Sequence, residues 1–257
     1  VVFTGDMVSS RGNAQPLYAL IEMLRELKPD APIYMIPGDK DPLPASMSYA
    51  TGGSPFAPWV LGAKQRGGQL LSAPVQIERD GHTLWLTTSA LLSLDMDTMQ
   101  AQFERQYLDA LADGDENAIE LTTYNLQWLT ETRNARAKMT DADVYIALTH
   151  VPPADEELES AYPGSLRERV HLVLCGHYQG GLIRLPFAGA LFIPSQNLPF
   201  YGILPGKNTY YGLTKKGGTY LYVSPGLGNN DGLYPLPFFR LFNPPTVSLI
   251  SLTTSSL

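Results

Sequence analysis

Apolar residues recur at helical spacing in three stretches of the chain. In residues 13–28 they fall three or four positions apart, and Pro16 suits the first turn of a helix. This spacing predicts an amphipathic helix over 13–28. The same spacing predicts two further helices, one around residues 99–111 and one around residues 121–135.

Short, continuous apolar runs alternate with these helices and predict strands. Residues 1–3 lead into a Gly-Asp turn, and residues 31–36 lead into Pro-Gly-Asp, so the opening predicts a βαβ unit. Val144–Leu148 and His171–Cys175 predict two more strands, each ending in a loop that holds a histidine. A chain of this pattern belongs to the mixed α/β class.

The remaining segments carry weaker signals. Residues 75–78 and 83–87 flank Asp80-Gly81 and predict a β-hairpin. Residues 45–68 are rich in Gly, Pro and Ser and predict an irregular surface loop. From Leu182 onward the chain is mostly of β type, with short apolar runs at 191–193, 220–223 and 247–252.

Composition narrows the class of protein. The chain has 257 residues, 44% hydrophobic and 17% charged, and it has no repeat or linker, which predicts a single domain over 1–257. Its 18 basic against 25 acidic residues give a net charge of −7, which argues against nucleic acid as a partner. One cysteine, Cys175, excludes an internal disulfide and a Cys-rich metal cluster.

Candidate chemistry is concentrated where the predicted strands end. Asp6, Asp39 and Asp41 follow the two N-terminal strands, and His150 and His177 follow the two later ones. Each alone is an ordinary turn or loop residue. Loops beyond the carboxyl ends of parallel strands converge, however, and carboxylates with imidazoles suit a divalent transition metal. The joint placement therefore predicts a metal site at one edge of a sheet.

The motifs in these loops, in this order, resemble those of the calcineurin-like metallophosphoesterases. They are Gly5-Asp6, Gly38-Asp39-Lys40-Asp41, His150-Val151-Pro152-Pro153 and Gly176-His177-Tyr178-Gln179. Later stretches, at residues 180–186, 221–228 and 240–245, resemble a bacterial subgroup that is anchored to the membrane and faces outward. The resemblance implies a two-sheet β-sandwich flanked by helices, with two metal ions (Mn, Zn or Fe) that activate water to hydrolyse a phosphoester.

The resemblance also implies a role for each candidate ligand. Asp6 would bridge the two metals, and Asp39, His150 and His177 would complete the second metal site. Gln179 stands where the family has the last histidine of the first metal site, and its amide oxygen is a weaker ligand than imidazole. The second site is therefore expected to be more nearly complete than the first.

Lys40 is the catalytic candidate, because it replaces a family histidine that lies near the substrate. A lysine there would stabilise charge on the phosphate as a point cation and would be a poor proton donor. The alternative is that Lys40 only pairs with Asp39 or Asp41 at the surface.

The N-terminus shapes the expectations about location. The chain opens inside what should be a central strand, so we expect a truncated start, with an Asp-x-His strand and a hydrophobic anchor upstream of Val1. The protein would then be extracytoplasmic and membrane-associated through that missing segment, although a cytoplasmic location stays open. The expected substrate is a phosphoester small molecule or phospholipid.

Two questions stay open from the sequence. The non-family choices at positions 39, 40 and 179 also fit a domain that has lost catalysis and binds a metal or ligand. A group of aromatic residues after the last motif could line a site for a lipid-like substrate or pack in the core: Phe200, Tyr201, Tyr210 and Tyr211.

Overall fold

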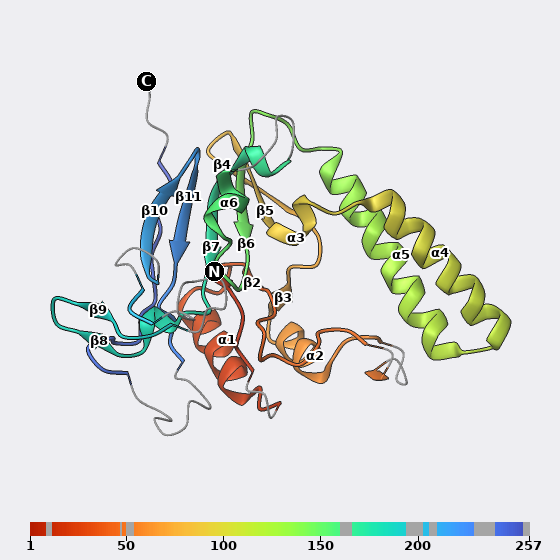
Figure 1. Ribbon diagram of the computed structural model, residues 1–257. Helices are drawn as coiled ribbons and strands as arrows, with labels where there is room; N and C mark the ends of the chain where they lie inside the picture. Colours follow the sequence, from red (N-terminus) through yellow and green to blue (C-terminus); the bar gives the residue numbers. More distant parts are fainter. Residues whose placement is uncertain are drawn as a thin grey trace.

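The computed structural model describes residues 1–8, 12–46, 48–49, 54–159, 166–193, 203–205, 210–228 and 240–253 (Figure 1). Three parallel strands form its first sheet, in the order β1 (Val2–Phe3), β2 (Ile33–Met35) and β3 (Gly68–Leu70). Helix α1 (Gln15–Leu27) connects β1 to β2 and begins with a proline in its first turn. The predicted βαβ unit and its helix are confirmed.

The segment 45–68 differs from the predicted loop, because it contains helix α2 (Pro58–Gln65). Pro58 starts this helix, where its missing N–H costs nothing. Trp59, Val60 and Ala63 are buried against α1 and the first sheet. The run is short and contains Gly62, so its composition suggested a loop although its apolar positions pack in the core.

The second sheet has six strands in the order β10-β11-β7-β6-β5-β4. Its four inner strands run parallel to one another, and each edge strand pairs antiparallel with its neighbour. The predicted hairpin and the two histidine-bearing strands are confirmed. The strands are β4 (Val75–Arg79), β5 (His82–Thr88), β6 (Val144–Leu148), β7 (Val170–Cys175), β10 (Gly212–Lys216) and β11 (Thr219–Val223).

Between β5 and β6 the chain forms the predicted pair of long helices. Helices α4 (Met96–Asp113) and α5 (Glu116–Arg136) pack side by side and project from the rest of the molecule (Figure 1). Asp95 and Asp115 cap their N-termini by accepting hydrogen bonds from backbone amides. The shorter elements are α3 (Ser89–Leu92), α6 (Asp155–Glu159), the 3₁₀ turns Leu166–Arg169 and Gln179–Gly181, and the hairpin β8 (Arg184–Leu185) with β9 (Gly189–Ala190).

Apolar side chains of both sheets meet in one layer. Ile36 and Leu71 of the first sheet's loops pack there against Leu86, Ile146 and Leu174 of the second sheet. Separate clusters cover the outer faces of the two sheets. The chain is therefore a mixed α/β protein in which the ends of β1, β2, β6 and β7 lie at one shared edge.

Two of the weaker β predictions are wrong. Within the described range 240–253, residues 247–252 form no regular strand, and Val247 and Leu249 are exposed. In 191–193 the structure shows only a single bridge from Phe192 to Ile203. An apolar run alone does not make a strand when no neighbouring strand pairs with it along its length. Among the described residues, no helix is long and apolar enough to cross a membrane.

Candidate metal centre

Four of the side chains predicted from the sequence gather into one cluster, which we call the metal cluster: Asp6, Asp39, His150 and His177. One ligand atom from each lies within 4.8 Å of all the others. His150 Nε2 is central, at 3.3 Å from Asp6 Oδ2, 3.1 Å from Asp39 Oδ1 and 3.2 Å from His177 Nδ1. His177 Nδ1 is 3.6 Å from Asp39 Oδ2.

The topology explains why residues so distant in sequence meet. Asp6 and Asp39 follow the neighbouring parallel strands β1 and β2 of the first sheet. His150 and His177 come two residues after β6 and β7, which are neighbours in the second sheet. Because the two sheets share an apolar layer, the carboxyl ends of all four strands converge on this edge.

Two glycines let the loops approach closely enough for the cluster to form. A Cβ atom at Gly5 would come within 2.6 Å of both Gly38 Cα and His150 Nδ1. A Cβ atom at Gly38 would collide with the Asp6 carboxylate. Any larger residue at either position would push the β1 and β2 loops apart.

Two of the four cluster residues have an unusual backbone conformation. Asp6 has φ +56° and His177 has φ +66°, in the left-handed region that few non-glycine residues adopt. Such positions cost free energy and persist where the surrounding structure fixes them, commonly at functional sites. Here the conformation turns both side chains towards His150.

Thr4 fixes the orientation of the His150 ring. His150 Nδ1 lies 2.7 Å from the carbonyl oxygen of Thr4, which can only accept, so Nδ1 donates its hydrogen there. Nε2 is then the atom that faces the two carboxylates and His177. Metal-binding histidines in proteins are commonly held in this way by a backbone carbonyl.

Hydrogen bonds control the charge of Asp6. Burial opposes its ionisation, but hydrogen bonds from His150 and from the Lys40 backbone amide, at 3.0 Å, outweigh burial and lower the pKa of Asp6 to about 2. The carboxylate of Asp6 is therefore ionised at neutral pH.

The pKa of His150 is also set by burial and by hydrogen-bond partners, and the partners have the larger effect. Burial favours the neutral ring, whereas the hydrogen bonds to Asp6 and to the Thr4 carbonyl, with the negative charges of Asp6 and Asp39, raise the pKa of His150 above its ordinary value. The two carboxylates that would hold a cation therefore also favour the protonated form of His150.

Asp41 links the two loops that carry Asp6 and Asp39. The sequence did not identify this role. Its carboxylate accepts hydrogen bonds from the backbone amides of Val8, at 2.6 Å, and Gly38, at 2.7 Å. Burial outweighs these bonds and raises the pKa of Asp41. The available signal for such a link was a second aspartate close after the Gly38-Asp39 turn, since aspartate side chains often accept hydrogen bonds from nearby backbone amides.

The spacing of the ligand atoms suits one metal ion. Ligands at about 2.1 Å from a tetrahedral ion are roughly 3.4 Å apart, close to the separations in the metal cluster. His150, His177 and Asp6 are mostly buried, whereas the Asp39 side chain is 50% exposed. An ion and a ligand could therefore enter from the Asp39 side.

Gln179 and Lys40, the other two candidates, lie in the same loops. Gln179 also has a positive φ, and its side-chain Oε1 atom is buried without a hydrogen-bond partner. A buried acceptor of this kind fits a position that a metal would satisfy. The backbone amide of Lys40 donates a hydrogen bond to the Asp6 carboxylate.

The aromatic residues divide between the core and the undescribed part of the chain. Phe200 and Tyr201 lie outside the described residues. Tyr210 is buried in the core, where its hydroxyl accepts a hydrogen bond from the Ala190 amide. Tyr211 is partly exposed and packs against Arg184.

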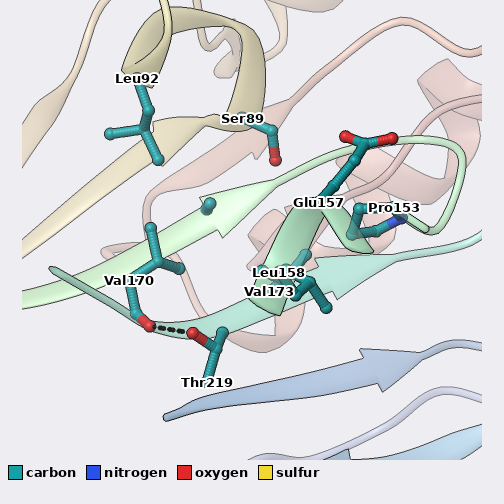
Figure 2. A pocket seen from close by; sticks show the side chains of 9 residues that line it. Ser89, Leu92, Pro153, Glu157, Leu158, Val170, Val173 and Thr219 are labelled. Carbon is teal, nitrogen blue, oxygen red and sulfur yellow. Dashed lines mark hydrogen bonds between the residues drawn. The ribbon is translucent and has the colours of Figure 1, made fainter. Parts of the chain in front are cut away.

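A small pocket lies away from the cluster, on the outer face of the second sheet. Figure 2 shows it between β6, β7, α3 and α6, with Glu157 and Leu158 close to it. Its volume of about 20 Å³ has room for roughly one water molecule. This pocket is too small for a phosphoester substrate.

Comparison with known proteins gives no family. No protein-family model matches the chain, and no curated protein matches it. The residues of the metal cluster are therefore the basis for a function.

Proposed function

We propose that this chain is the metal-dependent phosphoester hydrolase domain that its motifs resemble. The observation that carries the proposal is the metal cluster, with two carboxylates and two imidazoles within one ion's reach and His150 Nε2 turned towards the other three by Thr4. This set of donors suits Zn, Mn or Fe.

A divalent cation, when bound, would supply a Lewis acid for a phosphoryl oxygen and lower the pKa of a water molecule. The chain's own residues prepare for this charge. Asp6 is ionised, and His150 must lose its Nε2 proton to become a ligand. The half-exposed Asp39 leaves one side open to an incoming phosphoester.

Lys40 remains the candidate for stabilising the phosphate, since its backbone is fixed beside Asp6. Its ammonium group would act as a point charge and not as a proton donor. Gln179 would offer its buried amide oxygen to a second cation. The proposed fold is that of the calcineurin-like metallophosphoesterases, with its two packed sheets.

The same resemblance extends the proposal to location. An extracytoplasmic, membrane-anchored protein acting on a phospholipid or another small phosphoester would fit the bacterial subgroup. Fractionation of cells that express the natural protein would test this, with the protein expected in the membrane fraction and accessible from outside.

A second candidate is a domain that binds a metal without catalysis. Among the described residues, the Asp and His ligands form one cluster, enough for one metal ion, and the amide of Gln179 is a weak ligand for a second ion. Both observations favour this alternative. It predicts metal binding without turnover.

An assay of aryl phosphodiester hydrolysis by the natural full-length protein, with added manganese, distinguishes a hydrolase from a domain that only binds metal. We expect turnover that Asp39→Asn abolishes. Asp80→Asn, a change at an exposed aspartate of the β4–β5 hairpin, should leave the turnover intact. Lys40→Ala should lower kcat without changing the metal concentration required. Metal binding by the wild type without any turnover would support the binding domain instead.

A further inference from the structure

Two arginines beyond the metal cluster, Arg184 and Arg240, form what we call the arginine pair. They lie close together, because the backbone of Arg184 donates a hydrogen bond to Leu241, the residue after Arg240. Burial, and then the positive charge of Arg184, lower the pKa of Arg240. Among the described residues, no carboxylate forms an ion pair with either arginine.

Backbone carbonyls hold both guanidinium groups in place. Arg184 Nε donates to the carbonyl of Gly180 at 2.7 Å, and its guanidinium lies 3.9 Å from the Tyr211 ring centre. Arg240 donates through Nε to Gly228 at 2.8 Å and through Nη2 to Pro225 at 2.7 Å. These contacts fix the side chains before any ligand arrives, which lowers the cost of binding.

Each arginine keeps one donor without a partner. Arg184 Nη2 and Arg240 Nη1 are both buried and make no hydrogen bond. A buried, charged donor without a partner is costly, and the chain has an excess of acidic residues from which a partner could have come. We therefore look for the missing hydrogen-bond acceptor in a ligand from outside the chain.

Gly180 lets Asn243 lie beside Arg184, because any larger residue there would collide with both side chains. A Cβ atom there would lie 2.6 Å from Arg184 Nη2 and 2.7 Å from Asn243 Oδ1. Asn243 donates from its other side-chain atom to the Gln179 carbonyl at 2.7 Å, which fixes this oxygen at the same place. Donors from arginine with an acceptor from Asn243 match an oxyanion that carries a proton.

We propose that Arg184 and Arg240 bind a phosphate-type oxyanion, with Asn243 accepting a hydrogen bond from its protonated oxygen. The geometry of guanidinium groups favours such tetrahedral or planar oxyanions. The site joins the segment after β7, which holds Gly180 and Arg184, to the segment of Arg240 and Asn243. It binds its anion whether or not the chain is a hydrolase.

A calorimetric titration of the metal-free protein with inorganic phosphate tests the proposal. We expect saturable binding that Arg240→Gln and Arg184→Gln each weaken by roughly 10- to 100-fold, since each removes a charged hydrogen bond. Arg133→Gln is the matched control, because Arg133 already has a carboxylate partner in Asp97 at 2.9 Å. It should leave phosphate binding unchanged.

A parallel titration with glycerol 3-phosphate distinguishes the source of the anion. Binding of this ester at least as tight as that of phosphate would assign the site to the phosphate group of a larger ligand. Binding of inorganic phosphate alone would assign it to the free ion.

Absence of saturable phosphate binding by the folded wild type would overturn the proposal and leave water as the partner of the two donors. Equal binding by the wild type and a folded arginine variant would overturn it as well. Circular dichroism establishes folding, and if Arg184→Gln does not fold, the wild type and Arg240→Gln still decide the outcome.

Discussion

The metal cluster and the arginine pair both use the segment that follows β7, through His177 and Arg184, and they differ in how their charges are neutralised. In the metal cluster, carboxylates and imidazoles face one another at 3.1 to 3.6 Å, so a proton can hold them together. Among the described residues, the hydrogen bonds of the two guanidinium groups go to backbone carbonyls. In the metal cluster, a metal cation can therefore replace the proton that the carboxylates and imidazoles share. The arginine pair, in contrast, lacks an anion in the described part of the chain to neutralise its charge.

Removing a carboxylate from the metal cluster should have the largest effect on metal binding. We expect Asp6→Asn to weaken manganese or zinc binding by more than about 100-fold, because loss of a ligand exceeds the cost of losing a supporting contact. Asparagine tolerates the left-handed backbone at this position. Elemental analysis and metal titration measure the effect.

Asp80→Asn is the matched control for this change. Asp80 also has a positive φ, of +51°, but it lies exposed in the β4–β5 hairpin. Its variant should bind metal like the wild type. Equal metal binding by Asp6→Asn and the wild type would rule out Asp6 as a ligand.

Acid should weaken the metal cluster by a smaller step. The pKa of His150 is raised in the metal-free protein, so the metal must displace its proton. Metal affinity should fall about tenfold for each pH unit below that pKa, with release of about one proton on binding. Calorimetry in buffers of different ionisation enthalpy would count this proton, and no uptake or release would contradict the prediction.

The pH dependence of stability gives a still smaller effect. Asp6 has a pKa of about 2 in the folded protein, below its ordinary value of 3.8, so its contribution is present above pH 3.8 and is lost as the pH falls towards 2. The contribution of His150 is present below pH 6.5 and is lost as the pH rises through its raised pKa.

Together they predict that this pair stabilises the metal-free protein most between about pH 4 and pH 6.5, by roughly 1–2 kcal/mol. Asp6→Asn should flatten this part of the Tm profile, measured by thermal unfolding with a chelator present. A profile unchanged by Asp6→Asn would show that the Asp6–His150 pair does not contribute.

The smallest expected effect concerns Gln179. Replacing its buried amide by imidazole in Gln179→His should lower the metal concentration for half-maximal activity by a few-fold, since imidazole is the stronger ligand for a transition metal. An unchanged metal requirement would show that Gln179 does not contact a metal, and would limit the last motif to His177.

The sequence predicted those parts of the molecule in which local pattern and tertiary packing agree. Helix α1, the hairpin β4–β5 and strands β6 and β7 each have clear periodicity or a buried apolar run. Helix α2 was missed because Pro and Gly in a short segment resemble a loop. Its three buried residues form a helix only because α1 and the first sheet cover them.

For the site, residue type at strand ends was enough to find the four members of the metal cluster. Their supports were harder to find. The Thr4 carbonyl that orients His150 is a backbone atom without a side-chain signal, and Asp41 was indistinguishable from a surface partner of Lys40. The arginine pair joins segments 56 residues apart, at Arg184 and Arg240, which only the folded chain brings together.

We expect Asp6, Asp39, His150 and His177 to bind one divalent cation. The most direct test is an anomalous-scattering map from crystals of the protein grown with manganese. We expect a peak within about 2.0–2.3 Å of a carboxylate oxygen of each aspartate, of His150 Nε2 and of His177 Nδ1. A map without a peak there, from crystals in which manganese binds elsewhere or not at all, would contradict this expectation.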